Sequence, residues 1–199
     1  FIRTVLITFS FFWISYLSSK LGEDYLAVNT ILMQFIILAA FFIDAYAYST
    51  EGIIGFALGR KNKKSFLLTV KNSIILSFFT ALIISLFYLF FFKKIINIIT
   101  GIEILRFISY KHVIWIIIIP PIASFCYQLD GIFIGASQTK ELRNAMIFSV
   151  ISYVLISLLF ADLFGNTGIW ISLCLFMILR ALSLYYYLDK IYLKFDLIK

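Results

Sequence analysis

The sequence has 199 residues, of which 63% are hydrophobic and 14% are charged. A soluble domain carries about 25% charged and about half apolar residues, so this composition excludes that class, and a lipid bilayer is the solvent that fits it. The net charge of +7 does not indicate a nucleic-acid partner. Basic residues of membrane proteins gather in cytoplasmic loops, where they meet anionic membrane lipid.

Six apolar segments are each long enough to cross the membrane as a helix, which takes about 20 residues for about 30 Å of hydrocarbon. They cover approximately residues 4–21, 26–58, 66–92, 112–135, 145–164 and 168–188. The runs are too long and too continuous for the alternating strands of a barrel. We therefore predict an all-α integral membrane protein in which residues 1–199 form a single bundle of about six transmembrane helices. Residues 93–111 are expected to form a longer link with room for a short interfacial helix.

The basic residues predict the orientation of these helices. If the helices alternate in direction, most basic residues lie on one side of the membrane: Arg3, Arg60, Lys61, Lys63, Lys64, Lys140, Arg143, Lys190, Lys194 and Lys199. A smaller group lies on the other side: Lys20, Lys93, Lys94, Arg106 and Lys111. The positive-inside rule then places both ends of this multi-pass segment in the cytoplasm. The chain starts directly with an apolar helix and no signal peptide, so we expect it to be truncated at its N-terminus.

No motif of a catalytic or metal site is visible. The sequence lacks GxSxG, HExxH and a Walker-type glycine loop, so we do not expect an enzyme. Cys126 and Cys174 lie in apolar runs without CxxC spacing, and the single histidine, His112, cannot complete a metal site. We interpret both cysteines as small buried hydrophobic residues and expect no bound metal or other cofactor.

Ionisable residues inside the spans are costly to insert, by about 2.5–3.5 kcal/mol each, and therefore mark candidate functional positions. Asp44 and Glu51 are seven residues apart with Tyr48 between them, so helical geometry puts Asp44, Tyr48, Glu51 and Gly55 on one stripe. We expect that stripe to face the bundle interior or a water-filled cavity. On the fourth span Tyr127 and Asp130 share a face, and Arg180 lies at a comparable depth on the last span.

Two hypotheses fit these residues. In the functional one, the carboxylates bind a proton, a sodium ion or a cationic substrate during transport, since a buried carboxyl can take up and release a proton near physiological pH. In the structural one, Arg180 pairs with Glu51 or Asp130 and holds helices together. Asp44 has no basic residue at its level, which favours function there. Tyr48 and Tyr127 can stack on a flat cationic substrate, although interfacial anchoring is the commoner role of such tyrosines.

Other features concern helix geometry. Pro120 and Pro121 lie inside the fourth span and predict a kink, which would serve as a gating element or as a static bend. The polar side chains most simply interpreted as contacts between helices are Asn29, Gln34, Asn72 and Gln128. The pairs Gly55-x-x-x-Gly59 and Gly131-x-x-x-Gly135 allow close helix approach.

Several stretches resemble a known transporter family. Residues 21–35 (LGEDYLAVNTILMQF) and 44–59 (DAYAYSTEGIIGFALG) look like the seventh-to-eighth helix region of multidrug and toxic compound extrusion (MATE) transporters. Residues 129–136 (LDGIFIGA) with 143–146, and 165–170 (GNTGIW), resemble the tenth helix and the start of the last helix in the bacterial DinF-like branch. Ala45 and Gly52 stand where that branch usually has glycine and alanine, so local helix packing there is expected to differ.

The resemblance implies twelve helices in two pseudo-symmetric six-helix lobes, of which this chain would be the C-terminal one. It implies an antiporter in the bacterial inner membrane that exports organic cations, drugs or toxic metabolites in exchange for H+ or Na+. Its partner would be the N-terminal six-helix lobe of the same transporter. The best-attested coupling aspartate of the DinF-like branch lies on the first helix, outside this sequence, so Asp44, Tyr48, Glu51, Tyr127, Asp130 and Arg180 are candidates only.

Two alternatives remain open. A lipid-linked oligosaccharide or polysaccharide flippase of the same superfamily would line its cavity with several basic residues, whereas Arg180 is the only deep cation expected here. A non-transporting structural subunit would use its buried charges only to pair helices.

Overall fold

The computed structural model describes residues 2–196, and all six predicted spans are helices in it. The helices are α1 (Ile2–Leu21), α2 (Glu23–Gly59), α3 (Lys63–Ile99), α4 (Glu103–Gly135), α5 (Thr139–Phe164) and α6 (Asn166–Asp196). No strand occurs among residues 2–196, and each helix is long and apolar enough to cross a membrane. The predicted fold class is confirmed. Lys199 lies outside the described residues, and so does the side chain of Lys194.

The connection between α3 and α4 is shorter than the expected link over residues 93–111. Only residues 100–102 are non-helical there, and no separate interfacial helix is present in that stretch. Arg106 explains part of the sharp turn, because its Nε donates to the carbonyl of Thr100 at 2.7 Å and its Nη2 to that of Asn97 at 3.1 Å. These bonds satisfy carbonyls that the end of α3 leaves free. The polar residues that were left out of the predicted spans because of their low hydropathy therefore belong to the ends of α3 and α4.

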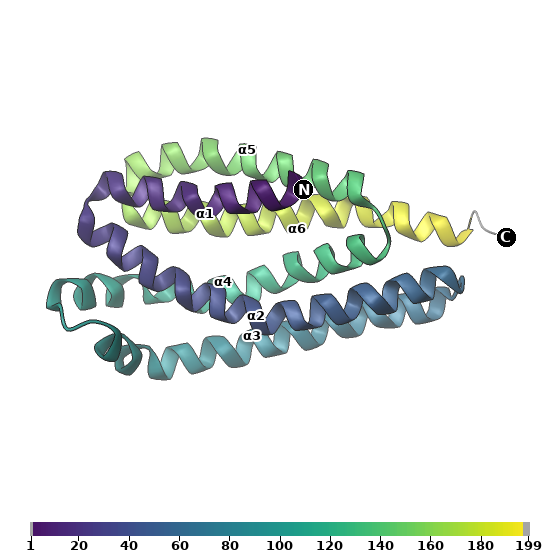
Figure 1. The fold of residues 1–199 in the computed structure, drawn as a ribbon, viewed down its shortest axis with the longest axis horizontal. Coiled ribbons are helices and arrows are strands. Elements are labelled where there is room, and N and C mark those ends of the chain that lie inside the picture. Colours follow the sequence, from purple (N-terminus) through teal and green to yellow (C-terminus); the bar gives the residue numbers. More distant parts are fainter. Residues whose placement is uncertain (1, 197–199) are drawn as a thin grey trace.

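The six helices form two groups joined by α4. Figure 1 shows α1, α5 and α6 side by side, with α2 and α3 on the other side of α4. The turns α1–α2, α3–α4 and α5–α6 lie at one end of the bundle, and the turns α2–α3 and α4–α5 lie at the other. The largest cluster of buried apolar side chains includes Leu32, Ile116 and Trp170, and a smaller one around Phe66 and Phe133 lies toward the α2–α3 turn.

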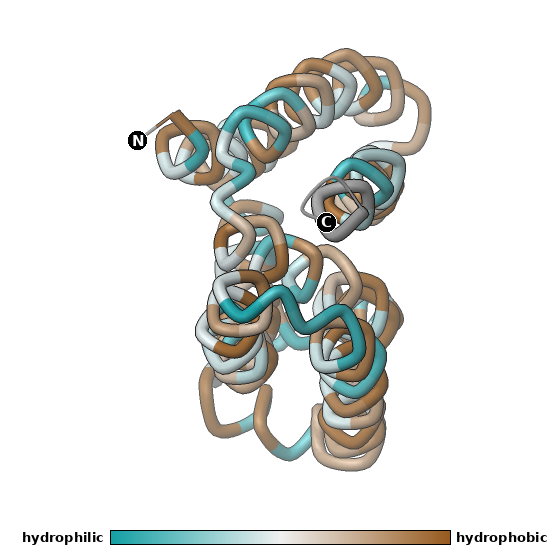
Figure 2. Tube along the Cα trace, turned by 90° about the vertical axis from the view of Figure 1, so that its right-hand side faces the viewer, coloured by the Kyte–Doolittle hydropathy of each residue, from teal (hydrophilic) through white to brown (hydrophobic). Residues whose placement is uncertain are grey.

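The outward faces of the helices are apolar. Large side chains are exposed along the whole bundle, with Phe90 74% and Phe41 70% exposed. Figure 2 shows that hydrophobic residues predominate along the helices and that hydrophilic residues gather at the α2–α3 turn. Exposure of so large an apolar surface to water would be unfavourable, whereas contact with lipid tails is not. The chain is a multi-pass membrane protein.

Helices α2 and α4 cross at close range. A Cβ atom added to Gly131 would lie 2.6 Å from the backbone oxygen of Ala47, and one added to Gly135 would overlap the backbone of Glu51. Glycine is therefore required at both positions for the two backbones to approach. Of the two predicted glycine pairs, the one on α4 makes the close approach, while Gly59 on α2 has no atom within 4 Å of an added Cβ.

Pro120 and Pro121 lie within α4, whose helical assignment continues through both. Proline at position 121 removes the backbone N–H that would otherwise bond the carbonyl of Ile117. Ser85 on α3 replaces that donor, with its Oγ 2.7 Å from the Ile117 oxygen. A neighbouring helix thus satisfies the freed carbonyl, as a membrane interior requires.

Candidate functional site

Three charged side chains from three helices meet inside the bundle. Arg180 on α6 donates to Oδ2 of Asp130 on α4, and Nη2 of Arg3 on α1 donates to the same oxygen at 2.7 Å. The side chains of Asp130 and Arg180 are each 3% exposed, whereas that of Arg3 is 33% exposed. Two cations therefore face one carboxylate in a largely dry environment.

Two polar atoms of this cluster lack a hydrogen-bond partner among the described residues. Oδ1 of Asp130 and Nε of Arg3 are buried, and neither has a hydrogen-bond partner among the described residues. A buried oxygen without a partner carries a desolvation cost of about 1–3 kcal/mol, more when it is charged. One oxygen of the carboxylate thus accepts from both arginines, while the other remains without a partner among the described residues.

Asp44 on α2 borders the same region. A cavity of about 280 Å³ opens between α1, α2 and α6, and its polar lining consists of Arg3, Ser10, Asp44, Tyr127 and Arg180. The remaining lining is apolar: Ile7, Phe11, Ile14, Ile36, Ile37, Ala40, Phe41, Leu173, Phe176 and Met177. Asp44 is half-buried. The cavity therefore offers a carboxylate, two guanidinium groups and a large apolar surface to one occupant.

Only part of the predicted stripe on α2 faces the cavity. Asp44 lines the cavity, but Glu51 is half-buried outside it and Tyr48 is 73% exposed. The interior face of α2 carries Ile43, Ala47, Thr50, Ile54 and Ala57 instead. The stripe is thus displaced from the interior of this bundle, and only its Asp44 end meets the cavity expected for it.

Of the other residues that the sequence singled out, some lie at the cavity and others do not. Tyr127 lines the cavity, and Arg180 bonds Asp130, which is one of the two pairings considered for it. Pro120 and Pro121 do not line this cavity. Among the described residues, no group of three or more potential His, Cys, Asp or Glu ligands could hold a metal ion.

Arg3 is the site residue that sequence reasoning assigned differently. From its position near the start of an apolar span, we expected Arg3 to lie on the cytoplasmic side of the membrane. In the structure α1 begins part-way along the bundle (Figure 1). The Arg3 side chain therefore lies within reach of Asp130 and pairs with it. Only the three-dimensional packing of α1 against α2, α5 and α6 gives that depth.

Of the four amides predicted to join helices, Asn29 and Gln128 are buried and do so, whereas Gln34 and Asn72 are exposed. Nδ2 of Asn29 on α2 donates to Ser18 on α1 at 2.7 Å and to Oδ1 of Asn166 on α6 at 2.5 Å. The indole of Trp170 donates to Oδ1 of Asn29 at 3.0 Å. On α4, Gln128 donates to the Ile43 carbonyl at 3.2 Å. Both networks are buried and lie outside the charged cluster, so they stabilise the bundle that positions it.

Comparisons with known proteins agree with this architecture. The family model MatE matches residues 1–163. The chain is 33% identical over 183 residues to the DNA damage-inducible protein F of Escherichia coli (strain K12), covering 92% of this chain and 40% of that protein. The chain therefore spans less than half the length of this curated relative.

Solved structures have the same fold. One described as the inward-facing conformation of a multidrug resistance MATE family transporter of the MOP superfamily matches with a TM-score of 0.89 at 16% identity, covering 100% of this chain and 47% of that one. An outward-facing conformation matches with a TM-score of 0.85 at 17% identity, covering 94% and 42%. A MOP superfamily transporter from Pyrococcus furiosus, whose binding pocket is described as having reverse polarity, also gives 0.85 at 17% identity, covering 94% and 42%.

Proposed function

This chain belongs to the MatE family, and on that premise we propose that it forms the C-terminal six-helix lobe of a secondary antiporter. The antiporter exports organic cations, drugs or toxic metabolites and takes in H+ or Na+. The chain works with an N-terminal six-helix lobe of the same transporter in a bacterial cytoplasmic membrane, with both ends of this segment in the cytoplasm. The basic residues at the α2–α3 and α4–α5 turns support that orientation.

The single observation that carries the proposal is the position of one carboxylate, Asp44, in the wall of a largely apolar cavity that also contains Arg3 and Arg180. Asp44 lines the cavity together with Arg3 and Arg180, both of which bond Asp130. A cationic substrate would place its charge at Asp44 and its apolar part against side chains such as Phe41 and Phe176. The same cavity gives the coupling ion access to this charged region.

The arrangement suggests how ion binding couples to movement. A cation at Asp44 would lie in the same cavity as Arg3 and Arg180, and its charge would weaken the contact that these arginines make with Asp130 between α1, α6 and α4. Rocking of lobes around a central site is the usual way such transporters alternate access. The likeness of this chain to lobes of both inward- and outward-facing structures supports movement of the lobe as a unit.

The test is efflux of a fluorescent organic cation from vesicles that contain the intact transporter. We expect efflux to stop when the H+ and Na+ gradients are both collapsed. The variant Asp44→Asn should insert normally and lose at least about tenfold of the rate, the loss produced by about 1.4 kcal/mol of transition-state stabilisation. Asp162→Asn, which neutralises an exposed carboxylate at the end of α5, is the matched control. Efflux that persists without gradients, or a wild-type rate in Asp44→Asn, would refute the proposal.

A flippase remains the second candidate, and one observation favours it. Two arginines, Arg3 and Arg180, line the cavity, where the sequence predicted one deep cation. Two guanidinium groups suit the pyrophosphate of a lipid-linked oligosaccharide. Transport assays of the unmodified protein separate the candidates, because a flippase would move a lipid-linked oligosaccharide and a cation exporter would not. A structural subunit would transport neither substrate.

A further inference from the structure

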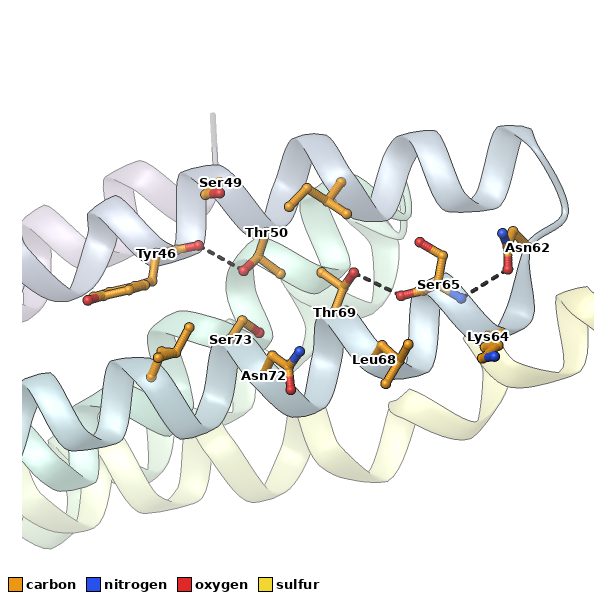
Figure 3. A pocket seen from close by; sticks show the side chains of 12 residues that line it. Tyr46, Ser49, Thr50, Asn62, Lys64, Ser65, Leu68, Thr69, Asn72 and Ser73 are labelled. Atoms are coloured by element: carbon orange, nitrogen blue, oxygen red, sulfur yellow. Dashed lines mark hydrogen bonds between the residues drawn. The ribbon is translucent and has the colours of Figure 1, made fainter.

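A second hollow lies outside the proposed transport site, between α2 and α3 near the α2–α3 turn (Figure 3). It has a volume of about 420 Å³ and is open along one side. We call it the α2–α3 groove, and its lining consists of Tyr46, Ser49, Thr50, Ile53, Asn62, Lys64, Ser65, Leu68, Thr69, Asn72, Ser73 and Leu76. Most of these side chains are polar, although the groove lies on spans predicted to cross the membrane.

The hydroxyl groups in the groove are largely committed to their own helices. Thr50 donates to the carbonyl of Tyr46 at 2.8 Å and Thr69 to that of Ser65 at 2.8 Å, as Figure 3 shows. The side chain of Asn62 accepts from the backbone N–H of Ser65 at 3.0 Å and caps α3. The Lys64 ammonium and the Asn72 amide are exposed donors of the lining that have no hydrogen-bond acceptor among the described residues, as are the Ser49 hydroxyl and the Asn62 amide nitrogen. All four therefore stay available to a ligand.

The charge of the groove is positive. No aspartate or glutamate is among its lining residues. The α2–α3 turn beside its mouth carries Arg60, Lys61 and Lys63 in addition to Lys64. The N-terminus of α3 starts there too, and its macrodipole adds to the attraction for an anion. An anionic group is thus the ligand that the mouth favours.

The surroundings of α3 indicate where this ligand comes from. The helix packs mainly against α2 and α4 and presents apolar side chains such as Leu67, Ile75 and Phe79 outward, which is typical of a lipid-facing helix. Its groove descends from the basic turn past exposed Leu68 and Leu76. A soluble anion would gain nothing from those leucines, whereas a lipid chain would. Polar groups facing hydrocarbon also require a polar partner at that depth.

We propose that the α2–α3 groove binds one anionic phospholipid from the leaflet next to the α2–α3 turn. Its phosphate lies at Lys64, the one charged residue of the lining. One acyl chain lies against Leu68 and Leu76. The site is independent of the transport cavity, because the two share no lining residue.

Lipid retention in native mass spectrometry tests the proposal. The intact protein is placed in nanodiscs of phosphatidylglycerol and phosphatidylcholine with identical acyl chains, and the adducts that survive release are counted. We expect retention of phosphatidylglycerol over phosphatidylcholine to fall about fivefold in Lys64→Gln, the effect of one basic residue at an anionic surface. Leu68→Asn should lower retention of both lipids and keep their ratio, because both lipids carry the same acyl chains. Lys64→Arg should behave as wild type.

Lys94→Gln is the matched control, since it removes an equally exposed lysine from the other end of α3. An equal loss of selectivity in Lys94→Gln and Lys64→Gln would overturn the proposal and leave a general basic surface. Displacement of phosphatidylglycerol by inorganic phosphate alone would overturn it in favour of a soluble anion. Unchanged lipid retention in Leu68→Asn would also overturn the proposal, and lost assembly in that variant would instead assign the groove to a protein partner. Transport activity is not the readout, so failure here is separate from failure of the proposed function.

Discussion

Arg180 on α6 donates to the carboxylate of Asp130 on α4, and both side chains are almost fully buried. Removing one partner from such a pair leaves an uncompensated charge in a dry interior. We therefore expect Asp130→Leu to lower the free energy of unfolding by about 3–5 kcal/mol. Thermal unfolding in detergent measures this loss.

Two further variants make that expectation specific. Asp130→Leu combined with Arg180→Leu should recover much of the lost stability, because neither of these two charges then remains alone. Lys190→Leu breaks the exposed pair with Glu141, whose atoms are 3.4 Å apart, and should cost at most about 1 kcal/mol. Equal losses in Asp130→Leu and Lys190→Leu would show that the buried pair does not hold α4 and α6 together.

The fold was predictable from the sequence because length and hydropathy alone decide whether a segment spans a membrane. The resemblance to the MATE family is likewise confirmed by the MatE match. The ends of the helices were not predictable in the same way. Polar residues such as Arg106 and Lys63 fall outside an apolar window, yet they continue helices beyond the hydrocarbon.

The site was predictable only in part, since a sequence gives depth along a helix but not the neighbour across it. Helical spacing placed Asp130, Tyr127 and Arg180 at a common level, but it offered Arg180 both Glu51 and Asp130 as partners. The packing of α6 on α4 selects Asp130. Arg3 was missed for the same reason, because its depth follows from how α1 lies against the bundle and not from its position in the chain.

Gly131 and Gly52 offer a matched test of close helix packing. A Cβ at position 131 would lie 2.6 Å from the Ala47 oxygen, whereas one at position 52 meets no atom within 4 Å. Gly131→Ala should therefore destabilise the protein by about 1–3 kcal/mol, since the crossing of α2 and α4 must open. Gly52→Ala should be neutral or stabilise by up to about 1 kcal/mol, because alanine suits a helix better. Unfolding temperatures of the two variants give the comparison, and a Gly131→Ala protein as stable as wild type would contradict it.

Ser85 and Pro121 should be energetically coupled. The Ser85 hydroxyl bonds the Ile117 carbonyl only because proline at position 121 cannot. Ser85→Ala should cost about 0.6–1.7 kcal/mol, the range for hydrogen bonds between membrane helices. In a Pro121→Ala background the new backbone N–H can serve that carbonyl, so the same change should cost less. A double-mutant cycle from unfolding measurements gives the coupling, and additive effects would show that Ser85 does not compensate for the proline.

Asn29 should be the most important amide for stability. Its side chain bonds Ser18, Asn166 and Trp170, and thereby joins α1, α2 and α6 at the end of the bundle away from the basic turns. Each hydrogen bond of this kind contributes about 0.6 kcal/mol on average, so Asn29→Leu should cost about 2 kcal/mol in unfolding free energy. The fluorescence of the buried Trp170 should also shift, because its indole loses its acceptor.

Asn144→Ala is the control for that measurement, since Asn144 is exposed and bonds only the neighbouring Arg143 among the described residues. Its removal should leave both stability and Trp170 fluorescence unchanged. A second variant, Ser18→Ala, removes one of the three partners and should cost about a third of the Asn29→Leu loss if the contributions add. A larger share would mean that the bonds strengthen one another, as buried networks do. No loss in Asn29→Leu would mean that apolar packing around Trp170 suffices to hold these helices, and the network would then have no measurable role in stability.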